Sequence, residues 1–135
     1  MSTNPHIWDT SRAGMLNELG ITDLSTSAVF VIYAGGQPAN ANAATTAANT
    51  VVASLAFPST NAFVTTTTGT ITANTITADT SCAGGTAAWF SIQKSTGARV
   101  LDGSVGTSSA DCIFPSTTFA TGATISVSSL TISLP

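Results

Sequence analysis

The stretch GGTAAWFSIQKSTGARVLDGS, residues 84–104, decides how the rest of the chain is interpreted. Its first half alternates along a strand, with Ala88, Phe90 and Ile92 on one face and Trp89, Ser91 and Gln93 on the other. KSTG then forms a connection of about four residues, in which Gly97 can take the left-handed conformation. ARVLDGSV forms the returning strand. The stretch therefore predicts a β-hairpin, and we expect Lys94 and Arg99 to flank its tip, in solvent, where they protect a sheet edge.

The same kind of signal recurs from residue 27 onward. SAVFVIY is a β-branched and aromatic run that ends at the turn-forming AGGQPAN, and TVVASLAF alternates at Val51, Ala53, Leu55 and Phe57. ANANAATTAAN between them has no apolar stripe, which indicates an extended loop. GTITANTITAD changes phase before Ile76, and ATISVSSLTISLP changes phase between Val127 and Leu130, so each predicts a bulge.

One helix precedes these strands. In DTSRAGMLNELG, Asp9 or Thr10 can cap the first turn, Met15, Leu16 and Leu19 share one face, and Gly20 can end the helix. We therefore expect an all-β chain, an antiparallel sandwich or jelly roll of about eight strands, with a short N-terminal helix and arm. The expected division is an arm and helix over residues 1–26 and a β-sandwich domain over residues 27–135.

The composition shows which side chains the surface lacks. Only 7% of the residues are charged and the formal net charge is −3, while Thr, Ala and Ser together make up nearly half of the chain. A surface so poor in long ionic side chains loses little side-chain entropy and little charge hydration when another protein covers it. This composition favours a subunit of a larger assembly; the alternative is a secreted Thr-rich domain that stays monomeric.

The composition also argues against several functions. Three basic residues cannot form the electrostatic footprint that nucleic acid requires. No run approaches the length of a membrane span, and the N-terminal residues lack the pattern of a signal peptide, so we expect synthesis in a cytoplasm and no membrane partner.

Residues that could carry catalysis are sparse. The single histidine, His6, has only Asp9 as a nearby carboxylate in sequence, and the other acids stand mostly in turn-like contexts where they accept backbone hydrogen bonds. Asp79, Asp102 and Asp111 could hold Ca²⁺ only if their loops converge, and no Asp-x-Asp spacing supports such a site. We therefore expect no enzyme, no cofactor and no metal.

The two cysteines leave three alternatives open. Cys82 and Cys112 lie in loop-like surroundings, DTSCAGG and SADCIFP, with no Cys-x-x-Cys motif. They can form an intrachain disulfide, remain free thiols, or bridge two subunits. A disulfide between Cys82 and Cys112 would close a loop of about 30 residues and contribute about 3–4 kcal/mol to the stability of the fold.

Several tracts together resemble a known family. IYAGGQPA, TAAWFSI and LDGSVGTS, within residues 27–134, are similar to the head decoration (cement) proteins of tailed bacteriophages, which are small virion structural proteins. Cys82 and CIFPSTTF depart from the pattern, since polar residues are more usual there. The resemblance implies a β-sandwich that binds the outside of a capsid shell and bridges major capsid protein subunits without catalysis.

From this resemblance we expect a virion protein on the capsid surface that forms a homo-oligomer, a trimer or a dimer. The predicted capsid or subunit interface comprises the apolar residues of the arm and helix, which are Ile7, Trp8, Met15, Leu16 and Leu19. Two alternatives stay open, an adhesive protein of a phage fibre or tail and a carbohydrate-binding β-sandwich module.

Overall fold

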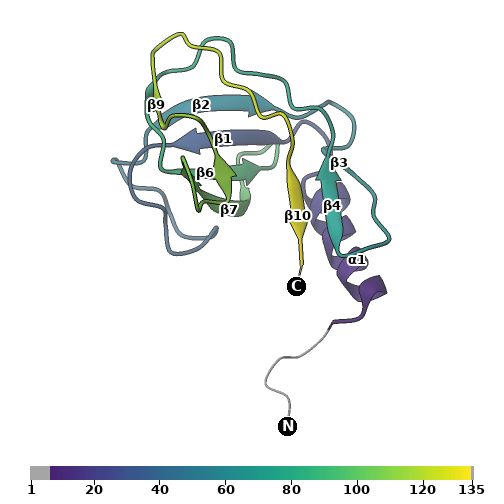
Figure 1. Cartoon of the computed structure of the whole chain (residues 1–135). Coiled ribbons are helices and arrows are strands. Elements are labelled where there is room, and N and C mark those ends of the chain that lie inside the picture. Colours follow the sequence, from purple (N-terminus) through teal and green to yellow (C-terminus); the bar gives the residue numbers. More distant parts are fainter. Residues whose placement is uncertain (1–6, 135) are drawn as a thin grey trace.

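The computed structural model describes residues 7–134 and shows a mainly β chain. Its ten strands form three sheets, and the largest is a curled half-barrel in the order β2-β1-β6-β7-β8 (Figure 1). The elements, in chain order, are α1 (Asp9–Asn17), the π-helical turn η1 (Glu18–Asp23), β1 (Val29–Tyr33), β2 (Val51–Ala56), β3 (Phe63–Val64), β4 (Thr70–Ala73), β5 (Gly85–Thr86), β6 (Trp89–Gln93), β7 (Arg99–Gly106), β8 (Cys112–Ile113), β9 (Thr118–Phe119) and β10 (Thr131–Ser133).

The prediction of about eight antiparallel strands is correct in class and wrong in two details. There are ten short strands, and β7 pairs with β8 in parallel, so the large sheet is mixed. The parallel pair arises because the chain loops back within residues 107–111, where Ser109 has a φ of 50°. A second sheet has the order β10-β4-β3, and β5 and β9 form a small ribbon.

The predicted hairpin is present as β6 and β7, and Gly97 at its turn has a φ of 88°. Strands β1 and β6 form the centre of the sheet, where Phe30 stacks on Phe90 with ring centroids 4.7 Å apart. The predicted alternation holds within β6, because Phe90 and Ile92 belong to the hydrophobic core and Trp89 does not. It is wrong at Ala88, which is exposed before the strand begins.

Two β-bulges change which residues face the core. In β2, Ile32 pairs with Ala53 but Tyr33 pairs with Val51, so Val52 is the extra residue. Val52 is therefore buried, and Val51, predicted to face inward, is 45% exposed. In β7 the register skips Val100, because Ile92 pairs with Leu101 and Gln93 with Arg99. An extra residue in one strand shifts every later side chain to the other face.

The predicted phase changes in the last two long segments are confirmed, and they lie opposite each other. Ile71 pairs with Ile132, and Asp79 pairs with Ile125. The chain advances by eight residues from Ile71 to Asp79 but by only seven from Ile125 to Ile132, so the first segment carries one extra residue. Between these pairings the two strands separate. The segment 126–129 makes no backbone hydrogen bond to another backbone group in the described range 7–134.

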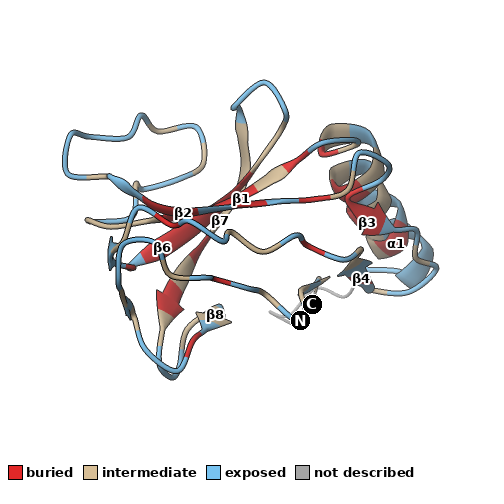
Figure 2. Cartoon of the chain, turned by 90° about the horizontal axis from the view of Figure 1, so that it is seen from above, coloured by how far each residue is buried: buried red, intermediate tan, exposed pale blue. Residues whose placement is uncertain are grey.

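The N-terminal helix shares the core of the strands. Leu16 and Leu24 are each 1% exposed and belong to the same cluster as Phe30 and Phe63, so the segments predicted as 1–26 and 27–135 have one common core. Figure 2 shows buried residues on the helix and on the strands that face it. The expected caps are wrong, because the N-cap is Trp8, which makes no side-chain capping bond, and Asp9 already lies in the helix.

Gly20 has a different role from the predicted one. It does not end the helix, because the chain continues through η1 to Asp23, and its φ is not positive. Instead, Gly20 is buried against β3 and β4. A Cβ at this position would lie 2.6 Å from Cδ1 of Ile71 and 3.0 Å from Cβ of Phe63, so only glycine allows this close approach.

Two glycine substitutions in the helical segment should therefore have opposite effects. We expect Gly20→Ala to lower the free energy of unfolding by about 1–3 kcal/mol, because it overpacks the contact with Phe63 and Ile71. Gly14→Ala should raise it by about 0.5–1 kcal/mol, because a Cβ at this position in α1 meets nothing within 4 Å and alanine favours the helix. Urea denaturation of both variants measures the change in the free energy of unfolding. Equal changes in the two variants would contradict the packing role of Gly20.

Candidate functional site

All three basic side chains of the protein form ion pairs within the chain. The pairs are Arg12 with Asp9, Lys94 with Asp23 at 3.2 Å, and Arg99 with Asp102 at 2.8 Å. The surface therefore presents no unpaired lysine or arginine, since the sequence contains only these three.

The remaining acids are also engaged, with one exception. Asp79 accepts a hydrogen bond from the backbone N–H of Ser54 at 2.9 Å, and Asp111 accepts one from the backbone N–H of Ser104 at 2.8 Å. Glu18 forms no ion pair within residues 7–134. As a result, nearly every ionic group is neutralised or hydrogen-bonded by the chain itself.

Arg99 is not the solvated residue that the sequence predicted. The bulge at Val100 places Arg99 on the same face of β7 as Asp102, and their side chains are only 9% and 5% exposed. Its guanidinium carbon lies 5.4 Å from the centroid of the Trp89 ring, and it donates a hydrogen bond to the carbonyl of Ala43. The loop 34–50 thus contributes to covering this outer face of the sheet. Lys94, in contrast, is partly exposed, as expected.

The outer face is a small second core with polar members. Trp89 stacks on Tyr33 with ring centroids 4.4 Å apart, and Gln93 donates to the Tyr33 hydroxyl at 2.8 Å. Burial raises the pKa of the Asp102 carboxyl, an effect that Arg99 and Ser91 partly offset. Oδ1 of Asp102 and Oγ of Ser91 are both buried and make no hydrogen bond of regular geometry within the described chain.

The three aspartates considered for Ca²⁺ bind different partners. Asp79 accepts from Ser54, Asp102 pairs with Arg99, and Asp111 binds Ser104. Among residues 7–134 no group of three His, Cys, Asp or Glu side chains could hold a metal ion. His6, the single candidate base, lies outside the described residues.

The predicted interface residues separate into two groups. Ile7, Trp8 and Met15 are 42%, 74% and 53% exposed, so they are available to a partner. Leu16 is 1% exposed and belongs to the core, so its place in the predicted interface is wrong: the helix face that carries it packs on the sheet. Leu19 is partly buried against the same core.

Both cysteines are free thiols in the structure. Cys82 is buried, and its thiol donates to the carbonyl of Ala120 at 3.2 Å. Cys112 lies in β8 and is half-buried. Burial, and then the neighbouring Asp111, raise the pKa of the Cys112 thiol, so little of the reactive thiolate forms at neutral pH.

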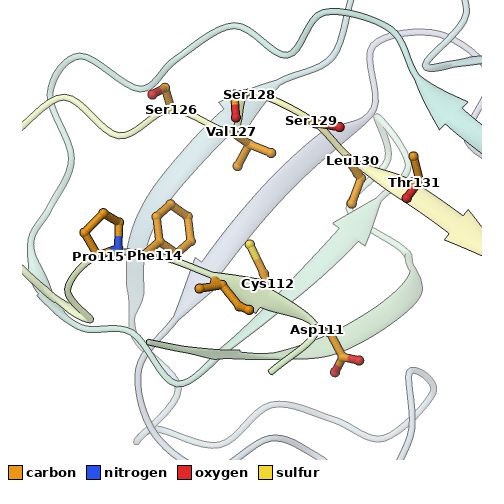
Figure 3. A pocket seen from close by; sticks show the side chains of 11 residues that line it. Asp111, Cys112, Phe114, Pro115, Ser126, Val127, Ser128, Ser129, Leu130 and Thr131 are labelled. Carbon is orange, nitrogen blue, oxygen red and sulfur yellow. The ribbon is translucent and has the colours of Figure 1, made fainter. Parts of the chain in front are cut away.

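A surface cavity lies between β8 and the C-terminal segment. It has a volume of about 320 Å³ and is lined by residues 111–115 on one side and 126–131 on the other. Figure 3 shows Val127 and Leu130 pointing from one wall toward Phe114 and Cys112 on the other. We call this cavity the β8 cleft. Its lining is mixed: apolar side chains such as Val127, Leu130 and Phe114 lie beside serine hydroxyls and exposed backbone.

One wall of the β8 cleft is the outermost strand of a sheet and the other is a segment outside the strands. Strand β8 is the last strand of the five-stranded sheet, and residues 126–131 lead into β10, the last strand of the three-stranded sheet. The backbone of residues 126–129 makes no hydrogen bond to another backbone group of the described chain. Unpaired backbone beside apolar side chains can bind an extended peptide. Sequence reasoning missed this cleft, although the phase change within SVSSL marks one wall.

Comparisons with known proteins identify no relative: no family model, no curated protein and no solved structure matches this chain. Within the described residues, no helix has the length and apolar character needed to span a bilayer.

The buried ion pair of β7 provides a test of the outer face. We expect Arg99→Met or Asp102→Asn to lower the free energy of unfolding by about 3–5 kcal/mol each, because either change leaves a buried partner uncompensated. The double variant should lose clearly less free energy of unfolding than the two single variants lose together. Lys94→Ala should cost less than about 1 kcal/mol, because the pair it forms with Asp23 is partly exposed. Denaturant unfolding measures all four, and additive losses would contradict the pairing.

Asp111 should make stability depend on pH. Hydrogen bonds from the backbone and hydroxyl of Ser104 lower the pKa of its carboxyl, so the folded state holds the ionised form more strongly than the unfolded chain does. The ionised Asp111 carboxylate therefore stabilises the folded state at pH values above the ordinary aspartate pKa of about 3.9. This stabilisation is lost as the pH falls through the lowered pKa of the folded state. The stability difference between the wild type and Asp111→Asn should shrink on acidification. A difference that stays constant from pH 7 to pH 2 would exclude this role.

Proposed function

We propose that this protein is a non-enzymatic structural protein of a tailed-phage virion. It binds the outside of the capsid shell and stabilises the shell by bridging major capsid protein subunits. It is made in the cytoplasm of the bacterial host and acts as a homo-oligomer at the capsid surface. It uses no cofactor, nucleic acid or membrane.

The observation that carries the proposal is the internal neutralisation of charge. Every lysine and arginine is paired within the chain, and the rest of the surface is rich in short hydroxyl and methyl side chains. Covering such a surface removes few hydrated charges and immobilises few long side chains. A protein that binds only the assembled shell shifts assembly toward it, and many copies on one lattice act together.

The finer description of the fold is part of the same proposal. The five-stranded sheet and the β10-β4-β3 sheet enclose the main core, and the N-terminal helix packs beside them. We assign this arrangement to the sandwich or jelly-roll class that the resemblance to decoration proteins implies.

The glycan-binding alternatives receive less support. Adhesive and carbohydrate-binding modules stack sugars on accessible aromatic rings, whereas Trp89 is fully buried between Tyr33 and Arg99. Strand β6 therefore offers no sugar platform; Trp8 is an accessible ring at 74% exposure, and we assign it to a protein contact.

The proposal is tested by shell binding. Purified protein is mixed with shells assembled from the major capsid protein of the same genome and sedimented, and the bound copies are counted. We expect saturable binding and a higher temperature of shell disruption. Absence of binding at micromolar protein would overturn the proposal, and specific retention on a glycan array would favour the adhesive alternative.

A matched pair of substitutions tests whether the helix contributes to the capsid contact. Met15 and Val51 are similarly exposed, at 53% and 45%, and lie on α1 and β2. We expect Met15→Glu to weaken shell binding at least about tenfold, because a buried unpaired carboxylate disfavours the contact, and Val51→Glu to leave it nearly unchanged. Deleting residues 1–20 would be a poorer test, since it removes Leu16 from the core. Equal losses from both glutamates would exclude a specific role for this helix face.

A further inference from the structure

The β8 cleft lacks one strand. Around the half-barrel, each strand has a neighbour until β8, and the next chain segment across the cleft is 126–131, which continues into β10. Residues 126–129 of one wall make no hydrogen bond to another backbone group of the described chain, and β8 on the other wall is the outermost strand of its sheet. An extended segment placed there would satisfy backbone groups and cover the side chains of Val127, Leu130 and Phe114.

The same chain carries two adjacent apolar residues whose side chains are exposed within the part that the structure describes. Ile7 and Trp8 are 42% and 74% exposed, and Trp8 has strand-like backbone angles, φ −61° and ψ 139°. Neither residue lines the β8 cleft of its own copy. We propose that Ile7 and Trp8 of one copy insert into the β8 cleft of a second copy.

The size and chemistry of the cleft suit this occupant. Its volume of about 320 Å³ is at the small end of ligand pockets, which suits one large side chain better than a cofactor. The indole ring would cover Val127 and Phe114, and its N–H can donate to a free carbonyl of segment 126–129. Asp111 at the rim disfavours an acidic peptide, whereas Ile7 and Trp8 carry no charge.

This contact joins two different surfaces and is therefore head-to-tail. Such contacts build a closed ring when the rotation between copies closes, and a chain of copies otherwise. Ile7 and Trp8 thus contact a second copy of the chain, and Met15 remains exposed and available to contact the capsid shell. This contact does not depend on the proposed function, because it forms between copies without a capsid.

Disulfide trapping tests the inference directly. Two variants are prepared with Cys82→Ala, so that Cys112 is the remaining native thiol. One adds Ile7→Cys, which leaves the Trp8 side chain in place, and the control adds Met15→Cys, which is exposed on α1 outside the proposed segment. With diamide as the oxidant, we expect covalent multimers from the first variant and at least about tenfold less from the control. Equal cross-linking of both would overturn the proposal.

A mixing experiment establishes whether the partner is a second copy. A tagged chain with Ile7→Cys, Cys82→Ala and Cys112→Ala is mixed with an untagged Cys82→Ala chain, so that each chain carries one cysteine and a bond can form only between chains. A tagged–untagged adduct supports the inference, and its absence, or bonds between tagged chains alone, overturns it.

The unmodified thiol gives an independent measurement that needs no added cysteine. In the wild type, maleimide labelling of Cys112 should slow at least about tenfold as the protein concentration rises and the cleft fills. Trp8→Ser should remove this dependence, while circular dichroism shows the fold unchanged. Labelling that is independent of concentration in the wild type would overturn the proposal even if shell binding is observed.

Discussion

The stacking of Phe30 on Phe90 across strands β1 and β6 is the contact around which the other elements are arranged. These two strands are among the three inner members of the five-stranded sheet, and they are covered on both faces. On one face, the aromatic pair packs with residues of the helix and of the three-stranded sheet. On the other face, Trp89, Tyr33 and Arg99 form the second core. The helix, the loop 34–50 and the hairpin therefore all depend on one central strand pair.

Much of this arrangement is predictable from the sequence, because hydrophobic periodicity reports the strands directly. The β6–β7 hairpin, the left-handed Gly97 and the irregular stretches near Ile76 and Val127 follow from local patterns. The errors have a common cause. A bulge adds one residue to one strand, so Val51 and Arg99 take faces that strict alternation does not assign to them.

Other features depend on contacts between distant segments. From the local sequence, Gly20 is predicted to end the helix. In the structure it is required to be glycine because Phe63 and Ile71 leave no space for a Cβ. Asp102 reads as a turn acid, yet it pairs with a buried arginine. The β8 cleft lies where two sheet edges face each other without pairing, and neither edge reveals the other in sequence. The helix face was only partly predictable, because Met15 and Leu16 were expected on one face, whereas Met15 is exposed and Leu16 is buried in the core.

The scarcity of basic residues also limits where trypsin-like proteases can cleave the protein. Trypsin-like proteases cut after lysine or arginine, and this chain has only three such positions. One lies inside helix α1, one ends the hairpin strand before its turn, and one is buried in β7 beneath the loop 34–50. Cleavage after Arg99 requires local opening of the central sheet, which occurs rarely in a stable domain. The three positions that such proteases recognise thus lie in a helix, in a buried strand and at the hairpin turn, and the turn at Lys94 is where cleavage is expected first.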